Sequence, residues 1–198
     1  MKVKHSPLAA VLAASLALFA SGVDEAQAQA APFTLSSPDL PGNAFPVKFI
    51  LNGFGCAGAN TSPALIWSNV PAGTKSLSLQ VHDPDAPTGS GFWHWAVYDM
   101  PPTTAGLAQG AGNAPTSLPA GAYGGNTDFV DTGATGGNGN YGGPCPPQGD
   151  RPHRYVFTVH ALKVDRFDVP AGASPAMVGY FLGMNRLGQA TLEARYGR

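Results

Sequence analysis

The stretch SLSLQVH at residues 76–82 decides the fold, because its polar and apolar residues alternate strictly. Leu77, Leu79 and Val81 fall on one parity, and serine, glutamine and histidine residues fall on the other. Successive side chains of a β-strand point to opposite faces, so this pattern predicts a strand with one buried face and one face exposed to solvent.

Other segments of the chain have the composition of strands and are separated by turn residues. The chain of 198 residues holds 26 Gly and 19 Pro, which punctuate short apolar segments. We expect further strands at residues 33–35, 46–51, 64–67, 93–98, 155–163 and 191–196. Many short strands between Gly and Pro turns are typical of a β-sandwich.

Two segments depart from the strand pattern. Ser174 followed by Pro175 has the signature of a helix start, and apolar residues at helical spacing follow as far as about Gly188. Residues 121–143 contain nine glycines without a phosphate-loop motif, so we expect a long surface loop.

Composition limits the function classes. Only 12% of the residues are charged, and 11 Lys and Arg against 12 Asp and Glu give a net charge of −1. This balance lacks the cationic excess of a general nucleic-acid binder. A hydrophobic fraction of 43% is too high for a disordered chain, and the length suits one domain, expected at residues 29–198.

The first 28 residues have the three parts of a secretory signal peptide. Lys2 and Lys4 precede a 13-residue apolar run at residues 8–20, and a small-x-small cleavage site follows at residues 26–28. A membrane anchor is the alternative, but a helix that spans a bilayer needs about 20 residues. We therefore expect removal of residues 1–28 and a periplasmic or secreted protein.

Export changes the meaning of the two cysteines, Cys56 and Cys145. An oxidising compartment favours a disulfide between them, whereas two buried free thiols are the alternative. Neither cysteine lies in a C-x-x-C pair, so the sequence does not support a zinc site or a thioredoxin-type motif.

Three short segments carry side chains that could form a site. HDPDAP at residues 82–87 is a loop stiffened by two prolines, and His94 lies on the polar parity of its strand. YGGPCPP at residues 141–147 precedes HRY at residues 153–155. Each segment alone also fits a plain surface turn or a solvent-facing histidine. Together they could direct histidine, tyrosine and backbone N–H groups into one cavity.

In this order and spacing, the three segments resemble the phosphatidylethanolamine-binding protein family, and most closely its bacterial Raf kinase inhibitor-like branch. The resemblance extends from about Phe33 to Tyr196 and includes NTSP at residues 60–63 and YVFTVHAL at residues 155–162. It implies a mainly β fold: a Greek-key β-sandwich of two antiparallel sheets, with one or two short helices and an anion-binding pocket at one end.

The same resemblance implies the ligand-binding residues. Matched position by position, they are Asp83, Asp85, His94, Pro146, Pro147, His153 and Tyr155. Imidazole and phenol groups can donate hydrogen bonds to phosphate oxygens. The carboxylates would orient and charge the histidines, or would receive an amine.

These observations favour an exported protein that binds a small anion, such as phosphate or a phosphoethanolamine-like group. A phospholipid head group, contacted at the membrane surface, is one source of such a group. The first alternative is a regulator that inhibits a kinase-like or protease partner, and the protein partner is unknown. The second is a hydrolase or metal-dependent enzyme that uses Asp83, His94 and His153. No nucleophile motif supports catalysis, and we expect no metal and no cofactor.

Overall fold

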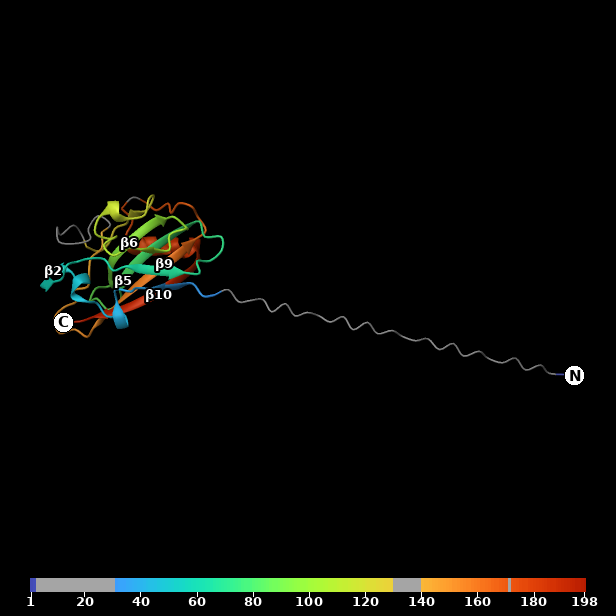
Figure 1. Cartoon of the computed structure of the whole chain (residues 1–198), viewed down its shortest axis with the longest axis horizontal. Coiled ribbons are helices and arrows are strands. Elements are labelled where there is room, and N and C mark those ends of the chain that lie inside the picture. Colours follow the sequence, from blue (N-terminus) through green and yellow to red (C-terminus); the bar gives the residue numbers. More distant parts are fainter. Residues whose placement is uncertain (3–30, 130–139, 171) are drawn as a thin grey trace. The chain divides into compact units, whose positions relative to one another are not determined.

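The alternating stretch that begins at Ser76 forms the central strand of a five-stranded antiparallel sheet (Figure 1). This strand is β5 (Ser76–Asp83), and its neighbours pair with it and with each other in the order β10-β9-β5-β6-β8. Their bounds are β6 (Phe92–Met100), β8 (Tyr123–Gly124), β9 (His153–Leu162) and β10 (Arg186–Tyr196).

A second, three-stranded sheet has the order β1-β4-β7. Its strands are β1 (Thr34–Ser36), β4 (Leu65–Ser68) and β7 (Gly106–Leu107). One apolar cluster contains residues of both sheets, such as Leu35 and Trp67 from the smaller sheet and Leu79 and Phe157 from the larger. The expected mainly β fold with antiparallel sheets is confirmed, and the strand order is compatible with a Greek key. A two-stranded hairpin, β2 (Asn52–Gly53) and β3 (Cys56–Ala57), completes the strands.

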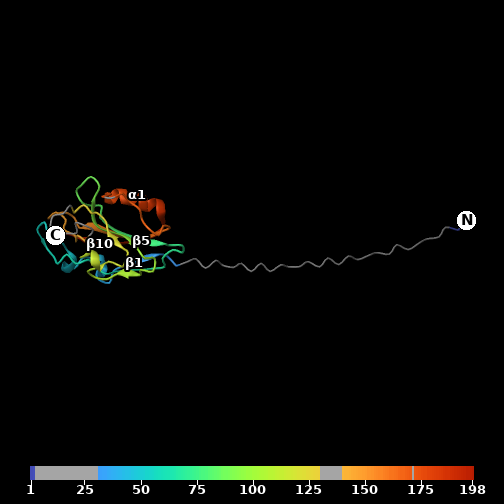
Figure 2. The same ribbon diagram turned by 90° about the horizontal axis from the view of Figure 1, so that it is seen from above.

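The helix α1 (Pro175–Asn185) covers the other face of the large sheet, opposite β1 (Figure 2). It begins as predicted, because the Ser174 side chain accepts a hydrogen bond from the backbone N–H of Met177. Val178 and Leu182 are buried in a second apolar cluster with Tyr98 of β6. The small sheet, the large sheet and α1 therefore form three successive layers.

The helix ends earlier than Gly188, and the last strand is longer than expected. Arg186 has extended backbone angles and already pairs with Leu162, so β10 begins at a residue that the apolar spacing had assigned to the helix. The carbonyl of Asn185 accepts the N–H of Lys163, which satisfies a helix-terminal group that would otherwise lack a partner.

The predicted strand at residues 46–51 is wrong. This segment contains a 3-10 turn, η2 (Val47–Phe49), and two similar turns are η1 (Pro41–Asn43) and η3 (Pro115–Ser117). Pro46 has no N–H for a sheet ladder, and Leu51 bonds instead to the carbonyl of Pro144. Phe49, Ile50 and Leu51 are nevertheless buried, whereas Val47 is exposed, and these three buried side chains explain why the segment has the composition of a strand.

The computed structural model describes residues 1–2, 31–129, 140–170 and 172–198, and residues 31–198 form one compact unit. The predicted signal peptide lies almost wholly outside the described residues. The glycine-rich segment at residues 121–143 is described only in part and contributes β8 to the sheet edge. Across the described ranges, no helix has both the length and the apolarity needed to cross a bilayer.

Candidate functional site

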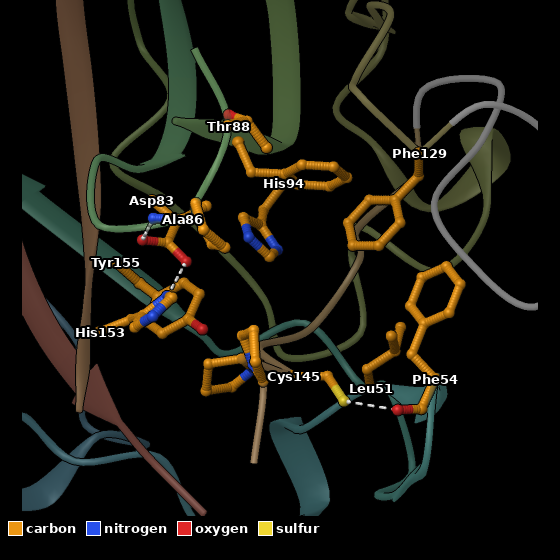
Figure 3. A pocket seen from close by; sticks show the side chains of 14 residues that line it. Leu51, Phe54, Asp83, Ala86, Thr88, His94, Phe129, Cys145, His153 and Tyr155 are labelled. Atoms are coloured by element: carbon orange, nitrogen blue, oxygen red, sulfur yellow. Dashed lines mark hydrogen bonds and ion pairs between the residues drawn. The ribbon is translucent and has the colours of Figure 1, made fainter. Parts of the chain in front are cut away.

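A cavity of about 290 Å³ opens at the edge of the large sheet where β5 ends and where β6 and β9 begin (Figure 3). Because β5 runs antiparallel to both β6 and β9, its end lies near the starts of those strands: Asp83 pairs with Phe92 of β6, and its side chain bonds to His153 of β9. Sheet topology alone therefore gathers the HDPDAP, His94 and HRY segments. The remaining walls come from loops.

Six of the seven side chains predicted for the site line this cavity, and Asp85 does not. The lining residues are Leu51, Phe54, Asp83, Ala86, Pro87, Thr88, Phe92, His94, Phe129, Cys145, Pro146, Pro147, His153 and Tyr155.

Asp83 and His153 form a buried pair at one wall. The Nδ1 atom of His153 lies 2.8 Å from one Asp83 oxygen, and the other oxygen accepts the N–H groups of Asp85 and Ala86. The Nε2 atom of His153 lies 3.3 Å from Asp150. A neutral imidazole can donate to only one of these carboxylates, whereas an imidazolium donates to both. Asp83 thus fixes the orientation of the His153 ring.

Tyr155 places an unsatisfied hydroxyl at the same wall. Its side chain is buried, and the hydroxyl makes no hydrogen bond of normal geometry among the described residues, although it lies near the Asp83 carboxylate. Burial, reinforced by the Asp83 charge, raises the pKa of Tyr155, so the phenol keeps its proton. A buried polar group without a partner costs free energy, and a ligand in the cavity could supply the partner.

His94 lies in the floor of the cavity with its ring held by the loop at residues 141–147. Its Nδ1 atom is 2.9 Å from the carbonyl oxygen of Gly142. Burial lowers the pKa of His94 to about 4, against the opposing effects of the Gly142 carbonyl and Asp83. His94 is therefore neutral near pH 7.

The wall opposite Asp83 is aromatic. The rings of Phe92 and Phe129 meet edge to face with centroids 4.9 Å apart, and Phe54 stacks on Phe129 at 6.3 Å. His94 contacts this group and Tyr155, with ring centroids 5.0 Å apart for the His94–Tyr155 pair. The cavity thus has one polar and one apolar wall (Figure 3).

Asp85 faces away from the cavity and anchors the loop instead. Its buried carboxylate accepts three hydrogen bonds from Arg154, at 2.8, 2.9 and 3.0 Å, and one from Arg151 at 2.8 Å. The side-chain bond from Arg154 is the largest cause that holds the pKa of Asp85 well below its usual range. Asp85 therefore fixes the HDPDAP loop to the start of β9.

A disulfide and the C-terminal residue hold the loop rim. Cys56 and Cys145 are bridged, which confirms the predicted disulfide and ties the β2–β3 hairpin to the proline-rich loop. The guanidinium of Arg198 donates to the carbonyls of Phe54, Gly55 and Pro146, at 2.7 to 3.2 Å. These bonds hold the hairpin, with Phe54 near its tip, beside the cavity.

Sequence reasoning missed several contributors. Phe54, Phe92 and Phe129 lie far apart in the sequence and belong to no motif, so the aromatic wall had no recognisable signal. Arg151 and Arg154, which bind Asp85, lie on either side of His153 in the sequence. Their positive charges could have indicated that one nearby carboxylate forms an ion pair instead of facing a ligand. Within the described ranges, no group of three His, Cys, Asp or Glu side chains is arranged to hold a metal ion.

Comparison with known proteins gives consistent matches over almost the whole described domain. Residues 36–197 match the family model described as phosphatidylethanolamine-binding protein. The chain is 46% identical to the UPF0098 protein YbcL of Escherichia coli over 171 residues, which is 85% of this chain and 90% of YbcL. The crystal structure of YbcL, described as a new member of the mammalian PEBP family, superposes with a TM-score of 0.77 at 44% identity, covering 85% of this chain and 99% of that one. A lipoprotein of Mycobacterium tuberculosis, LppC, is 37% identical over 84% of this chain and 73% of its own length.

Proposed function

The chain belongs to the phosphatidylethanolamine-binding protein family, and on that premise we propose that its cavity binds a small ligand with an anionic group, such as a phosphate or phosphoethanolamine-like group. The observation that carries the proposal is the Tyr155 hydroxyl, which is buried at the cavity wall without a partner among the described residues. A phosphate oxygen is a strong acceptor for such a donor.

As an imidazolium, His153 would offer a second donor on the polar wall through its Nε2–H. The 3.3 Å contact between His153 and the partly exposed Asp150 is the longer of the two carboxylate contacts to that ring, so a ligand oxygen can replace it at low cost. The Asp83 carboxylate lies within hydrogen-bond distance of His153 and accepts two backbone N–H groups, and these contacts reduce its repulsion of an anion. No Lys or Arg lines the cavity within the described residues, so we expect modest affinity.

The aromatic wall suggests that the anionic group is attached to an apolar or carbon-rich body. Phe54 and Phe129 lie across the cavity from Tyr155 (Figure 3), and Phe92 packs edge to face on Phe129. Burial of apolar ligand area there contributes about 25 cal/mol per Å². This combination favours an organic phosphate over inorganic phosphate.

The proposed function includes export. The disulfide, the leader-like residues 1–28 and the similarity to a protein named as a lipoprotein support a location outside the cytoplasm. We expect the exported chain to begin at Gln29 or Ala31. Intact-mass analysis that shows residues 1–28 retained would contradict this.

Calorimetric titration with phosphoethanolamine and with inorganic phosphate tests the binding proposal. Replacement of Tyr155 by Phe removes only the unpartnered hydroxyl, and we expect a five- to twentyfold weaker affinity for phosphoethanolamine. Tyr98→Phe is the matched control, because the Tyr98 hydroxyl is also buried without a partner but lies on the α1 side of the sheet. Equal binding by the wild type and the Tyr155→Phe protein would refute the assigned role of Tyr155, and no binding by the wild type would refute the function.

A further inference from the structure

The position of the proton on His94 follows from its contact with Gly142. A carbonyl oxygen accepts hydrogen bonds but cannot donate, so the Nδ1 atom that lies 2.9 Å from the Gly142 oxygen carries a hydrogen. In the neutral ring, Nε2 then has a lone pair and no hydrogen. None of the described residues donates a hydrogen bond to Nε2, and the ring projects into the cavity (Figure 3).

The surroundings of His94 keep the ring neutral. The titratable groups that face it are Asp83 and His82 from β5, Asp128 from the loop after β8, and His153 and Tyr155 from β9. Burial outweighs the attraction of the two carboxylates and lowers the pKa of His94 to about 4. Between pH 5 and 8 the ring therefore offers the cavity an acceptor.

We infer that Nε2 of His94 selects ligands that present a hydrogen-bond donor, either the P–OH of a singly protonated phosphate monoester or an ammonium group. The inference rests on the proposed function and names the ligand class of the same cavity. A phosphodiester, or a fully ionised monoester, presents only acceptor oxygens. Such a ligand would face the Nε2 lone pair with its own lone pairs and leave a buried acceptor unsatisfied.

Three probes of similar size separate the two sources of the donor: ethyl phosphate, diethyl phosphate and phosphoethanolamine, each titrated calorimetrically at pH 5 to 8. The second ionisation of a phosphate monoester lies near pH 6. We expect ethyl phosphate to bind at least tenfold more tightly at pH 5 than at pH 8, and more tightly than diethyl phosphate at pH 5. Diethyl phosphate does not titrate in this range, so any change in its affinity reports groups of the protein rather than of the ligand.

Phosphoethanolamine identifies the donor. If the ammonium group supplies it, the affinity changes less with pH than that of ethyl phosphate, because the ammonium stays protonated. If the P–OH supplies it, the two affinities fall together as the pH rises. Equal affinities for ethyl and diethyl phosphate at every pH would overturn the inference while the proposed function stands. If none of the probes binds, both fail.

A His94→Phe protein provides an independent test, because it keeps the aromatic shape and removes Nε2. The preference for ethyl over diethyl phosphate should disappear in it and persist in a His160→Phe control, whose histidine lies outside the cavity. If His94→Phe does not fold, nitrogen NMR of the wild-type imidazole replaces it. We expect an unprotonated Nε2 whose resonance shifts when ethyl phosphate binds. A protonated Nε2, or no shift on binding, would overturn the inference.

Discussion

Removal of the Cys56–Cys145 disulfide should destabilise the fold through the unfolded chain. The cysteines are 89 positions apart, so the bridge closes a long loop in the denatured state. For a loop of that length, the chain-entropy relation gives about 4–5 kcal/mol at 25 °C. The folded state should change little, because the Arg198 bonds to Phe54, Gly55 and Pro146 still hold the hairpin.

Urea unfolding of the Cys56→Ser/Cys145→Ser double variant and of the oxidised wild type measures this loss. In a domain of this size, the midpoint of thermal unfolding should fall by about 10–15 °C. A reductant should lower the stability of the wild type towards that of the variant and should leave the variant unchanged. A loss of less than about 1 kcal/mol would refute the reasoning, because it would mean that the denatured chain keeps these segments close without the bridge.

Three further predictions concern single residues. Asp85→Asn should cost about 1–3 kcal/mol at pH 7, since it weakens the charge-assisted bonds from Arg154. Because the pKa of Asp85 is depressed, its contribution is present above the unfolded value near 4 and is lost as the pH falls below it, so the unfolding free energies of the two proteins should converge in acid. Gly143→Ala should cost more than about 2 kcal/mol in urea unfolding, because a Cβ there would collide with the backbone around Phe49. Burial lowers the pKa of His160 in the folded protein to about 4. As the pH falls from about 6.5 to 4, the unfolded chain therefore binds a proton at His160 before the folded protein does, and the free energy of unfolding decreases. Between pH 7 and 4, His160→Leu should make this decrease smaller by about 2–3 kcal/mol.

The strands that build the site could be predicted because alternation of apolar and polar residues is a local signal. The alternation of residues 76–82 correctly predicted β5, but the expected exposure of its polar face is wrong, because β5 is buried on both faces. Ser78 and Gln80 are covered, and the Gln80 side chain donates to the carbonyl of Pro175 in α1. The start of α1 was also predictable, since Ser174 and Pro175 act locally. The segment at residues 46–51 was not, because its burial comes from loop contacts, and burial alone does not distinguish a strand from an irregular segment.

Asp83 and Asp85 show where reasoning from the sequence about the site reaches its limit. The two carboxylates are two positions apart in one motif, and nothing local distinguishes them. Asp83 ends β5 and faces the cavity, while Asp85 is turned toward Arg154 by bonds that depend on where β9 begins. Which carboxylate faces a ligand is therefore a property of strand pairing, and the sequence alone does not display it.

The polar wall and the rim of the cavity are held in place by different parts of the fold, so a substitution can affect one and leave the other unchanged. Its polar wall stands on strand ends, so Asp83, His153 and Tyr155 keep their geometry as long as the large sheet is paired. Its rim is formed by loops that the Cys56–Cys145 disulfide and the hydrogen bonds of Arg198 hold in place. Changes at the rim should therefore alter how a ligand body is enclosed without moving the polar groups that recognise its charged end. Under the proposed function, the cavity would therefore accept variation in the attached body, while Tyr155 would require an acceptor and His94 a donor on the head group.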